Sequence, residues 1–192
     1  MLTLPKMSAR KTIVCLGDSF VDLQVAGVQR LPGWGQDAEC SGVTLMPGGS
    51  CANVARHLAS IGSGCLSVSL CTAVGDDEFG RWFLSQLRTE GLLVSPDKSV
   101  VVLAGVPQST CVVLSGASDR AMVSCYSSNR LMRAEDFECL QGGGAGGGAD
   151  DGKLSHLHVG GYFNCEALHS DAMLALVLAA HAINDGFVVN LH

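Results

Sequence analysis

Short apolar runs alternate with amphipathic segments along this chain, and that order constrains its fold more than any other feature. Runs with the length and composition of buried strands occupy residues 12–16, 66–74, 156–159 and 187–191. Helical spacing and end signals predict helices over residues 50–61, 76–88, 134–140 and 166–183. Strands and helices in alternation are typical of a mostly parallel sheet with helices on its faces. We therefore predict a single α/β domain.

A second group of strands is predicted to lie apart from that sheet. Short apolar runs occupy residues 100–103, 110–114 and 121–126, and a further strand is expected near residues 43–46. Residues 116–119 have the composition of a turn, which predicts a β-hairpin between the runs on either side. We expect the runs between residues 100 and 126 to form an antiparallel flap.

Composition and charge limit the compartments and partners of the protein. The 192 residues include 12 Lys and Arg, scattered along the chain, and carry a formal net charge of −6, so nucleic acid is not an expected partner. The 9 cysteines contain no Cys-x-x-Cys pair, which favours a reducing compartment. The N-terminus lacks the apolar run of a secretory signal, and the longest apolar stretch is too short to span a bilayer. A cytoplasmic protein with no membrane contact is expected.

A glycine pair, Gly48 and Gly49, runs directly into the predicted helix 50–61. Because glycine lacks a Cβ atom, the backbone there can approach a polar ligand closely. Asn53 lies in the first helical turn, beside its free N–H groups. Asp22 follows the first predicted strand. Ligands of parallel sheets bind at the carboxyl ends of the strands, so both segments are expected to line one crevice.

Two predicted helices begin at residues that are typical helix caps. Ser50 is expected to cap the helix after the glycine pair. Asp76 or Asp77 is expected to cap the helix that ends near residue 88. These aspartates also lie at a strand-to-helix junction, where a ligand contact is the alternative interpretation. Capping is favoured, because aspartate at this position is common for structural reasons alone.

Three segments then match one family in its own order. LGDSFVD, PGGSCANVARHLASIG and AVGDDEFGRWFLSQLRTEGL resemble the N-terminal part of the ribokinase-like (PfkB) carbohydrate kinases, and LHVGGYF continues the match over nearly the whole chain. The resemblance implies a ribokinase-like three-layer αβα fold with a mostly parallel sheet and a small β lid. It implies lid strands within residues 22–46 and 100–127 of a single incomplete domain over residues 1–192.

The resemblance also implies a function and a site. Asp22 is similar to the family's sugar-binding aspartate, whose carboxylate can accept hydrogen bonds from two neighbouring hydroxyls. Gly48, Gly49 and Asn53 resemble its glycine pair and substrate asparagine. The implied activity is ATP-dependent phosphorylation of a sugar or nucleoside hydroxyl, with ATP and magnesium as the cofactors of the full-length family. A homodimer formed through the lid strands is also implied.

Two departures limit what the resemblance predicts. Cys51 stands where the family usually has glycine or another very small residue. The family's Gly-Ala-Gly-Asp segment, which carries the catalytic base, and its magnesium-linked Asn-x-x-Glu motif are expected beyond His192. We therefore expect a C-terminally truncated domain that is inactive in isolation, with no catalytic or metal-binding residue and with unknown nucleotide contacts. The alternative function is a non-catalytic polyol-binding or dimerisation module.

Three other patterns suggest different chemistry less strongly. Residues 141–152 contain a glycine-rich stretch with P-loop spacing at its end, but its context favours a flexible insertion. Gly-Asp-Ser-Phe resembles the nucleophile block of GDSL esterases, with Ser19 as nucleophile, yet that family's Asp-x-x-His is missing. Zinc-type pairs occur at His156 and His158 and at Cys165 and His169, without further ligands nearby in the sequence.

Overall fold

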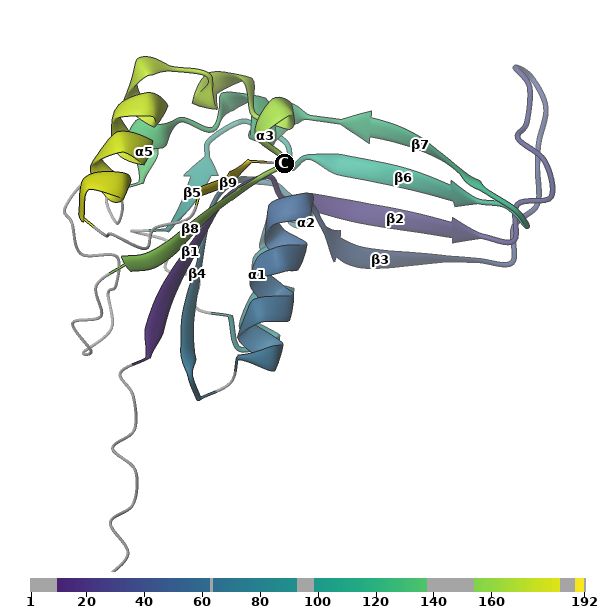
Figure 1. The fold of residues 1–192 in the computed structure, drawn as a ribbon. Helices are drawn as coiled ribbons and strands as arrows, with labels where there is room; N and C mark the ends of the chain where they lie inside the picture. Colours follow the sequence, from purple (N-terminus) through teal and green to yellow (C-terminus); the bar gives the residue numbers. More distant parts are fainter. Residues whose placement is uncertain (1–9, 63, 93–98, 138–153, 184–188, 192) are drawn as a thin grey trace, which may run out of the picture.

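The computed structural model describes residues 10–62, 64–92, 99–137, 154–183 and 189–191, and it consists of two sheets with helices around one of them (Figure 1). The larger sheet has the order β5-β4-β1-β8-β9, and we call it the main sheet. Its strands are β1 (Lys11–Gly17), β4 (Leu66–Gly75), β5 (Val100–Leu103), β8 (Leu154–Gly160) and β9 (Val189–Leu191). Every neighbouring pair is parallel, as the alternating pattern predicts.

Helices cover both faces of the main sheet. On one face lie α1 (Ser50–Ile61) and α2 (Glu78–Thr89), whose side chains Ala55, Phe83 and Leu87 pack against Leu70 of the sheet and its neighbours. On the other face lie α3 (Ser127–Leu131) and α5 (Asp171–Ile183), and Met173 of α5 packs in the core there (Figure 1). Apolar side chains from alternate positions of each strand fill the two cores, so the predicted three-layer αβα fold is confirmed.

The second sheet, which we call the small sheet, projects from the main sheet as an arm (Figure 1). It has the order β3-β2-β6-β7. Its strands are β2 (Phe20–Ala26), β3 (Gly42–Gly48), β6 (Thr110–Ser115) and β7 (Arg120–Cys125). The predicted hairpin is confirmed, because β6 and β7 are antiparallel and the Gly116 N–H donates to the Asp119 carbonyl at 2.9 Å. Strand β2 runs parallel to β6 and antiparallel to β3, so the sheet is mixed.

Several sequence predictions need correction. Residues 100–103, expected in the flap, form β5 and pair with β4 in the main sheet. The resemblance implied lid strands within residues 22–46, but no strand was placed at β2, because only two residues separate it from β1 and its polar positions resemble a loop. The predicted helix 166–183 begins late, since the 3-10 turns η2 (Tyr162–Asn164) and η3 (Glu166–Leu168) precede α5.

Other differences are local. Helix α3 was not predicted, and only the 3-10 turn η1 (Ala134–Asp136) is found within the described part of the expected helix 134–140. The glycine-rich stretch 141–152 lies outside the described residues, as do residues 187–188 of the last predicted strand.

Buried polar side chains join the two sheets. Gln108 Nε2 donates to the Ser19 carbonyl at 3.2 Å, and Gln108 Oε1 accepts the Gly75 N–H at 3.0 Å. The Asn129 side-chain oxygen accepts the Ser19 N–H at 3.1 Å, and the Asn129 N–H donates to the Ser109 hydroxyl at 3.0 Å. These bonds fix the starts of β2 and β6 against the end of β4, so they set where the small sheet leaves the main sheet.

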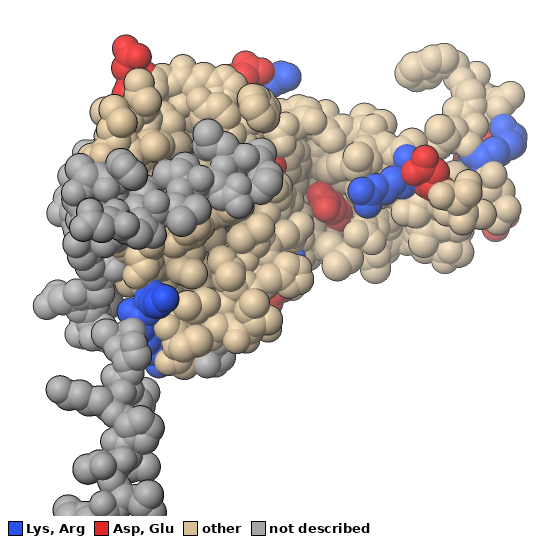
Figure 2. Space-filling view, viewed as in Figure 1, with Lys and Arg blue, Asp and Glu red and all other residues tan. Residues whose placement is uncertain are grey.

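Charged groups are sparse on the visible surface. Figure 2 shows that Lys, Arg, Asp and Glu are scattered over this face, which is otherwise uncharged. None of the helices within the described ranges has both the length and the apolar character that crossing a bilayer requires.

Candidate functional site

The glycine pair stands where β3 of the small sheet turns into α1. Gly48 pairs with Phe20 of β2, and a Cβ atom at Gly48 would overlap the Asp22 carboxylate. Gly49 has φ 101°, and a Cβ atom there would lie 2.7 Å from the Asp18 carbonyl oxygen. Position 49 therefore requires glycine for its backbone conformation and its close backbone contact, whereas a side chain at position 48 would displace the Asp22 carboxylate. The structure places the Asp22 carboxylate directly beside Gly48.

Asp22 lies on β2, half-buried, rather than in a loop after the first strand. Burial raises the pKa of its carboxyl group, and the nearby charge of Asp18 raises the pKa further. A half-buried carboxylate gains from hydroxyl or N–H donors that a ligand brings, because burial removes part of its solvation.

Asp18 is the residue that the sequence analysis missed. It is 2% exposed and comes directly after β1. Its Oδ1 accepts the Cys51 N–H at 2.9 Å, its carbonyl accepts the Ala52 N–H at 3.3 Å, and Oδ2 accepts from Asn164 Nδ2 at 3.1 Å. An acidic residue at the carboxyl end of a buried strand was the available signal, the same one that pointed to Asp22.

The start of α1 is therefore capped differently from the prediction. Ser50 is the first helical residue and Gly49 occupies the N-cap, with no side-chain cap bond. Asp18, which follows β1, takes the place of the missing side-chain cap. Its carboxylate and its carbonyl oxygen each accept an N–H group of the first turn of α1. Cys51 is fully buried at this contact, so the family departure noted in the sequence is accommodated in the core.

A second glycine pair closes the same site from β8. Gly161 has φ 63°, and a Cβ atom there would overlap the Asp18 carboxylate. A Cβ atom at Gly160 would lie 2.9 Å from the Cys51 Cα atom. Burial is the largest influence on Asp18 and raises the pKa of its carboxyl group, against the lowering effect of its hydrogen bonds. Asp18 therefore organises the site from within, while Asp22 lies at its more open side.

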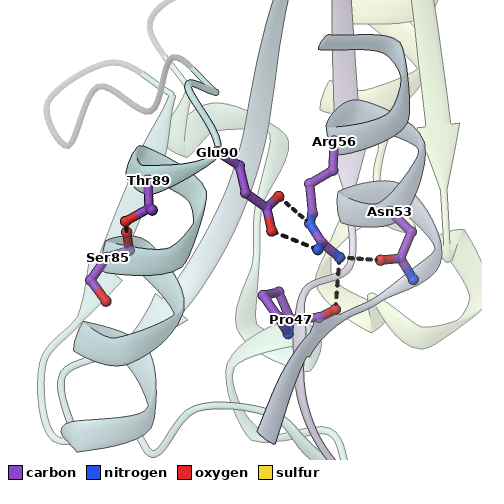
Figure 3. Close-up of polar contacts among 6 residues, drawn as sticks. All are labelled: Pro47, Asn53, Arg56, Ser85, Thr89 and Glu90. Atoms are coloured by element: carbon purple, nitrogen blue, oxygen red, sulfur yellow. Dashed lines mark hydrogen bonds and ion pairs between the residues drawn. The ribbon is translucent and has the colours of Figure 1, made fainter. Parts of the chain in front are cut away.

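Asn53 projects from the first turn of α1, as predicted, but its amide is already engaged. Its Oδ1 accepts from Arg56 Nη1 at 2.9 Å, and Arg56 Nη1 also donates to the Pro47 carbonyl at 3.0 Å (Figure 3). The remaining Nη2 and Nε groups of Arg56 pair with Glu90 (Figure 3). Asn53 is thus held in one orientation by a residue that the sequence analysis did not single out.

Asp76 and Asp77 have structural partners. The Asp77 side chain accepts the Gly80 N–H at 2.9 Å, which confirms it as the cap of α2, and its other oxygen accepts the Gln108 N–H at 3.1 Å. Asp76 Oδ2 accepts the Gly105 N–H at 2.7 Å. Capping is therefore confirmed for Asp77, whereas the Asp76 carboxylate holds the backbone that follows β5.

The patterns that suggested other chemistry find little support. Ser19 is 0% exposed and its hydroxyl donates to the Ala73 carbonyl at 3.2 Å, so it presents no nucleophile to a substrate. Cys165 is buried, whereas His169 is exposed and its ring lies against Tyr162. Within the described part of the chain, no three His, Cys, Asp or Glu side chains are grouped to hold a metal ion.

Comparison with known proteins identifies the family. The model of the pfkB family carbohydrate kinases matches residues 10–191. The chain belongs to this family. Among pfkB relatives, the bifunctional protein HldE of Rhodopseudomonas palustris is 36% identical over 93 residues, which are 46% of this chain and 18% of that protein. Fructokinase-1 of Zea mays is 30% identical over 135 residues, which are 68% of this chain and 38% of the fructokinase.

Solved structures of pfkB-like proteins share the fold. The ribokinase from Giardia lamblia has a TM-score of 0.72 at 18% identity, over 96% of this chain and 54% of the ribokinase. A fructokinase from Xylella fastidiosa, solved with bound ATP, has a TM-score of 0.67 at 19% identity, over 95% of this chain and 51% of that protein. The chain thus spans about half the length of these structures. The ribokinase-like fold predicted from the three segments is confirmed.

Proposed function

We propose that this chain forms the sugar-contacting part of a PfkB-type kinase and binds neighbouring hydroxyl groups of a sugar or nucleoside. The observation that carries the proposal is the packing of the bare Gly48 backbone against the Asp22 carboxylate, one helical turn from the Asn53 amide. This arrangement combines an acceptor on Asp22 and a donor on Asn53 at one end of the main sheet. A vicinal diol needs this combination, because each hydroxyl both donates and accepts.

The phosphorylation step belongs to the proposal only for a protein that supplies the rest of the family's domain. In that protein ATP with magnesium would be the phosphoryl donor, and a base would deprotonate the acceptor hydroxyl. We assign no catalytic, nucleotide-binding or metal-binding residue here. The role proposed for these residues is to orient the sugar, while the small sheet covers it and keeps water from the reacting atoms.

Calorimetry with D-ribose, D-fructose and adenosine tests this function directly. We expect one of these to bind, and we expect Asp22→Asn to weaken its binding by about tenfold or more, since a hydrogen bond to a charged group is lost. Asp76→Asn is the matched control, because the Asp76 carboxylate accepts the Gly105 N–H, and the asparagine keeps an oxygen that can accept it. If wild-type protein binds none of the three, or if Asp22→Asn binds as tightly as wild type, the proposal is wrong.

A second candidate function is self-association through the small sheet. Val43 and Leu45 on β3 and Val123 on β7 are exposed on one face of the small sheet, although large apolar side chains usually gain from burial. A second copy of the chain would cover them in a homodimer, as the family resemblance implies. Sedimentation analysis tests this: we expect a dimer in wild type and a monomer in Leu45→Lys/Val123→Lys. A wild-type monomer at all accessible concentrations would refute it.

A further inference from the structure

Arg56 makes four hydrogen bonds to three different elements. One edge of its guanidinium forms a bidentate contact with the Glu90 carboxylate, in which Nε donates to Oε2 at 2.6 Å and Nη2 donates to Oε1 at 2.7 Å. Nη1 donates to Asn53 Oδ1 at 2.9 Å and to the Pro47 carbonyl at 3.0 Å. Figure 3 shows that these groups surround the guanidinium between α1, the end of β3 and the residue that follows α2. Such a planar fork fixes geometry better than a single charge can.

The chemistry of arginine decides which way the Asn53 amide points. A guanidinium carries only N–H donors, so the group of Asn53 that faces it must be the carbonyl oxygen. The amide nitrogen, Nδ2, is then directed elsewhere, and both of its protons can be donated. Without Arg56, either end of the amide could turn toward a ligand, because the two ends have nearly the same shape.

The contact is partly sheltered on the arginine side. The side chain of Arg56 is 21% exposed and that of Glu90 is 38% exposed. The Arg56 contact lowers the pKa of the Glu90 carboxyl group, so Glu90 is ionised at neutral pH. Because Pro47 immediately precedes Gly48, Arg56 also ties Asn53 to the strand end that carries the glycine pair.

We propose that Arg56 is a positioning residue that fixes Asn53 as a hydrogen-bond donor to the ligand, and that Glu90 holds Arg56 in place for this purpose. This inference rests on the proposed sugar site and deepens it. Asp22 accepts and Asn53 donates, so the ligand must present a hydroxyl proton to Asp22 and a lone pair on a neighbouring oxygen to Asn53. The site should therefore select a vicinal diol in one orientation over its deoxy analogues.

A double-mutant cycle in binding tests the positioning role. We expect Arg56→Met and Asn53→Ala each to weaken binding of D-ribose, D-fructose or adenosine by about tenfold, the size of one hydrogen bond. The double variant should be no weaker than Asn53→Ala, because Arg56 acts only through that amide. Glu90→Gln should show a smaller loss in the same direction. If the losses in affinity of the two single variants multiply in the double variant, the proposal is overturned, because a general structural role of Arg56 would give an effect independent of Asn53.

Asn53→Asp tests the donor assignment itself. Aspartate keeps an oxygen for Arg56 but has no amide protons, so we expect an unchanged unfolding temperature and binding at least about tenfold weaker. Binding at the wild-type level would overturn the assignment. Arg81→Met is the matched control, because Arg81 forms a similar pair with Glu78 on the exposed side of α2, and it should bind as wild type does.

Unfolding temperatures without ligand separate the two proposals. Arg56→Met and Asn53→Ala should lower the unfolding temperature by less in combination than the sum of their separate effects. Additive shifts would overturn the Arg56–Asn53 contact even if sugar binds. If the wild-type protein binds no sugar, both the proposed function and the role of Arg56 in ligand binding are overturned. Non-additive shifts in unfolding temperature would in that case still support the contact between Arg56 and Asn53.

Discussion

Strands β4 and β3 have the same extended backbone but opposite surroundings. The last six residues of β4, in the main sheet, are all buried, whereas the first five residues of β3, in the small sheet, are all exposed. Side chains on both faces of the main sheet enter large apolar cores, but in the small sheet the buried cluster contains only Phe20, Cys111 and Val113. Hydrophobic burial therefore stabilises the main sheet, and backbone pairing with the junction network holds the small sheet.

The candidate site takes one part from each sheet. Asp22 belongs to β2 of the small sheet, while Asn53 and its partner Arg56 belong to α1, which packs on the main sheet. A displacement of the small sheet would thus separate the acceptor from the donor, so ligand binding should depend on the junction as well as on the site residues. The following variants test this difference between the sheets.

The largest expected effect comes from a core substitution beneath the main sheet. Phe83 is 0% exposed in the core on the α1 and α2 face. Phe83→Ala should lower the free energy of unfolding by about 3–5 kcal/mol, from lost burial and the cavity left behind. Val123→Ala in the small sheet, where Val123 is 65% exposed, should change it by less than about 0.5 kcal/mol. Urea unfolding measures both, and similar losses would contradict the comparison.

The junction should give the next largest effect. Gln108→Ala leaves the Gly75 N–H and the Ser19 carbonyl buried without this partner, which should cost about 2–3 kcal/mol. Amide hydrogen exchange should speed up in β2 and β6 more than in β1 and β4, because the junction is what orders the small sheet. Gln24→Ala, at a half-buried glutamine within β2, serves as the control. Uniformly faster exchange in both sheets would show that the junction is not a separate stabilising element.

A helix cap next to the junction should have a smaller effect. Asp77→Ala removes the cap of α2 and the acceptor for the Gln108 N–H, and should lower the free energy of unfolding by about 1–2 kcal/mol. Asp37→Ala removes an exposed carboxylate from the loop between β2 and β3 and should have almost no effect. Thermal unfolding distinguishes them, and equal shifts in the two variants would argue against the capping role.

Sequence reasoning succeeded where one physical signal dominates. Periodic burial predicted the ends of α1 to the residue and the buried strands β1 and β4 closely, because packing against a core decides those segments. It failed for β2, since Phe20 and Val21 are buried but the next four residues are only half-buried, so the strand has no strict alternation of buried and exposed positions. The start of the predicted helix 166–183 was wrong, because a 3-10 turn and an α-helix have similar apolar spacing over only a few residues.

The site was predicted through short motifs, and its hidden parts depend on tertiary contacts. Asp22, Gly48, Gly49 and Asn53 lie together at the start of α1, but their role in binding stays a prediction. Asp18 could not be recognised as the cap of α1, because its partners Cys51 and Asn164 are distant in sequence. The Arg56–Glu90 contact likewise joins α1 to the residue that follows α2, and no local sequence pattern indicates it.

Asp18 gives the smallest and most specific prediction. Burial raises the pKa of its carboxyl group in the folded protein above the ordinary value of 3.8, so protonation favours folding. Its contribution is fully present below the unfolded-state pKa and is lost as the pH rises through the folded-state pKa. Asp18→Asn keeps an acceptor for the Cys51 N–H and does not titrate, so wild type should gain stability relative to the variant as the pH falls from neutrality.

Urea unfolding of both proteins across this pH range measures the effect. Because both chains contain all the other carboxyl groups, the difference between their free energies of unfolding isolates position 18, apart from its coupling to Asp22. A difference that stays constant with pH would mean that the Cys51 and Asn164 donors compensate fully for the burial of the Asp18 charge. Asp18 would then cap α1 as an ordinary carboxylate, and the acidic pair would give the site no pH dependence of its own.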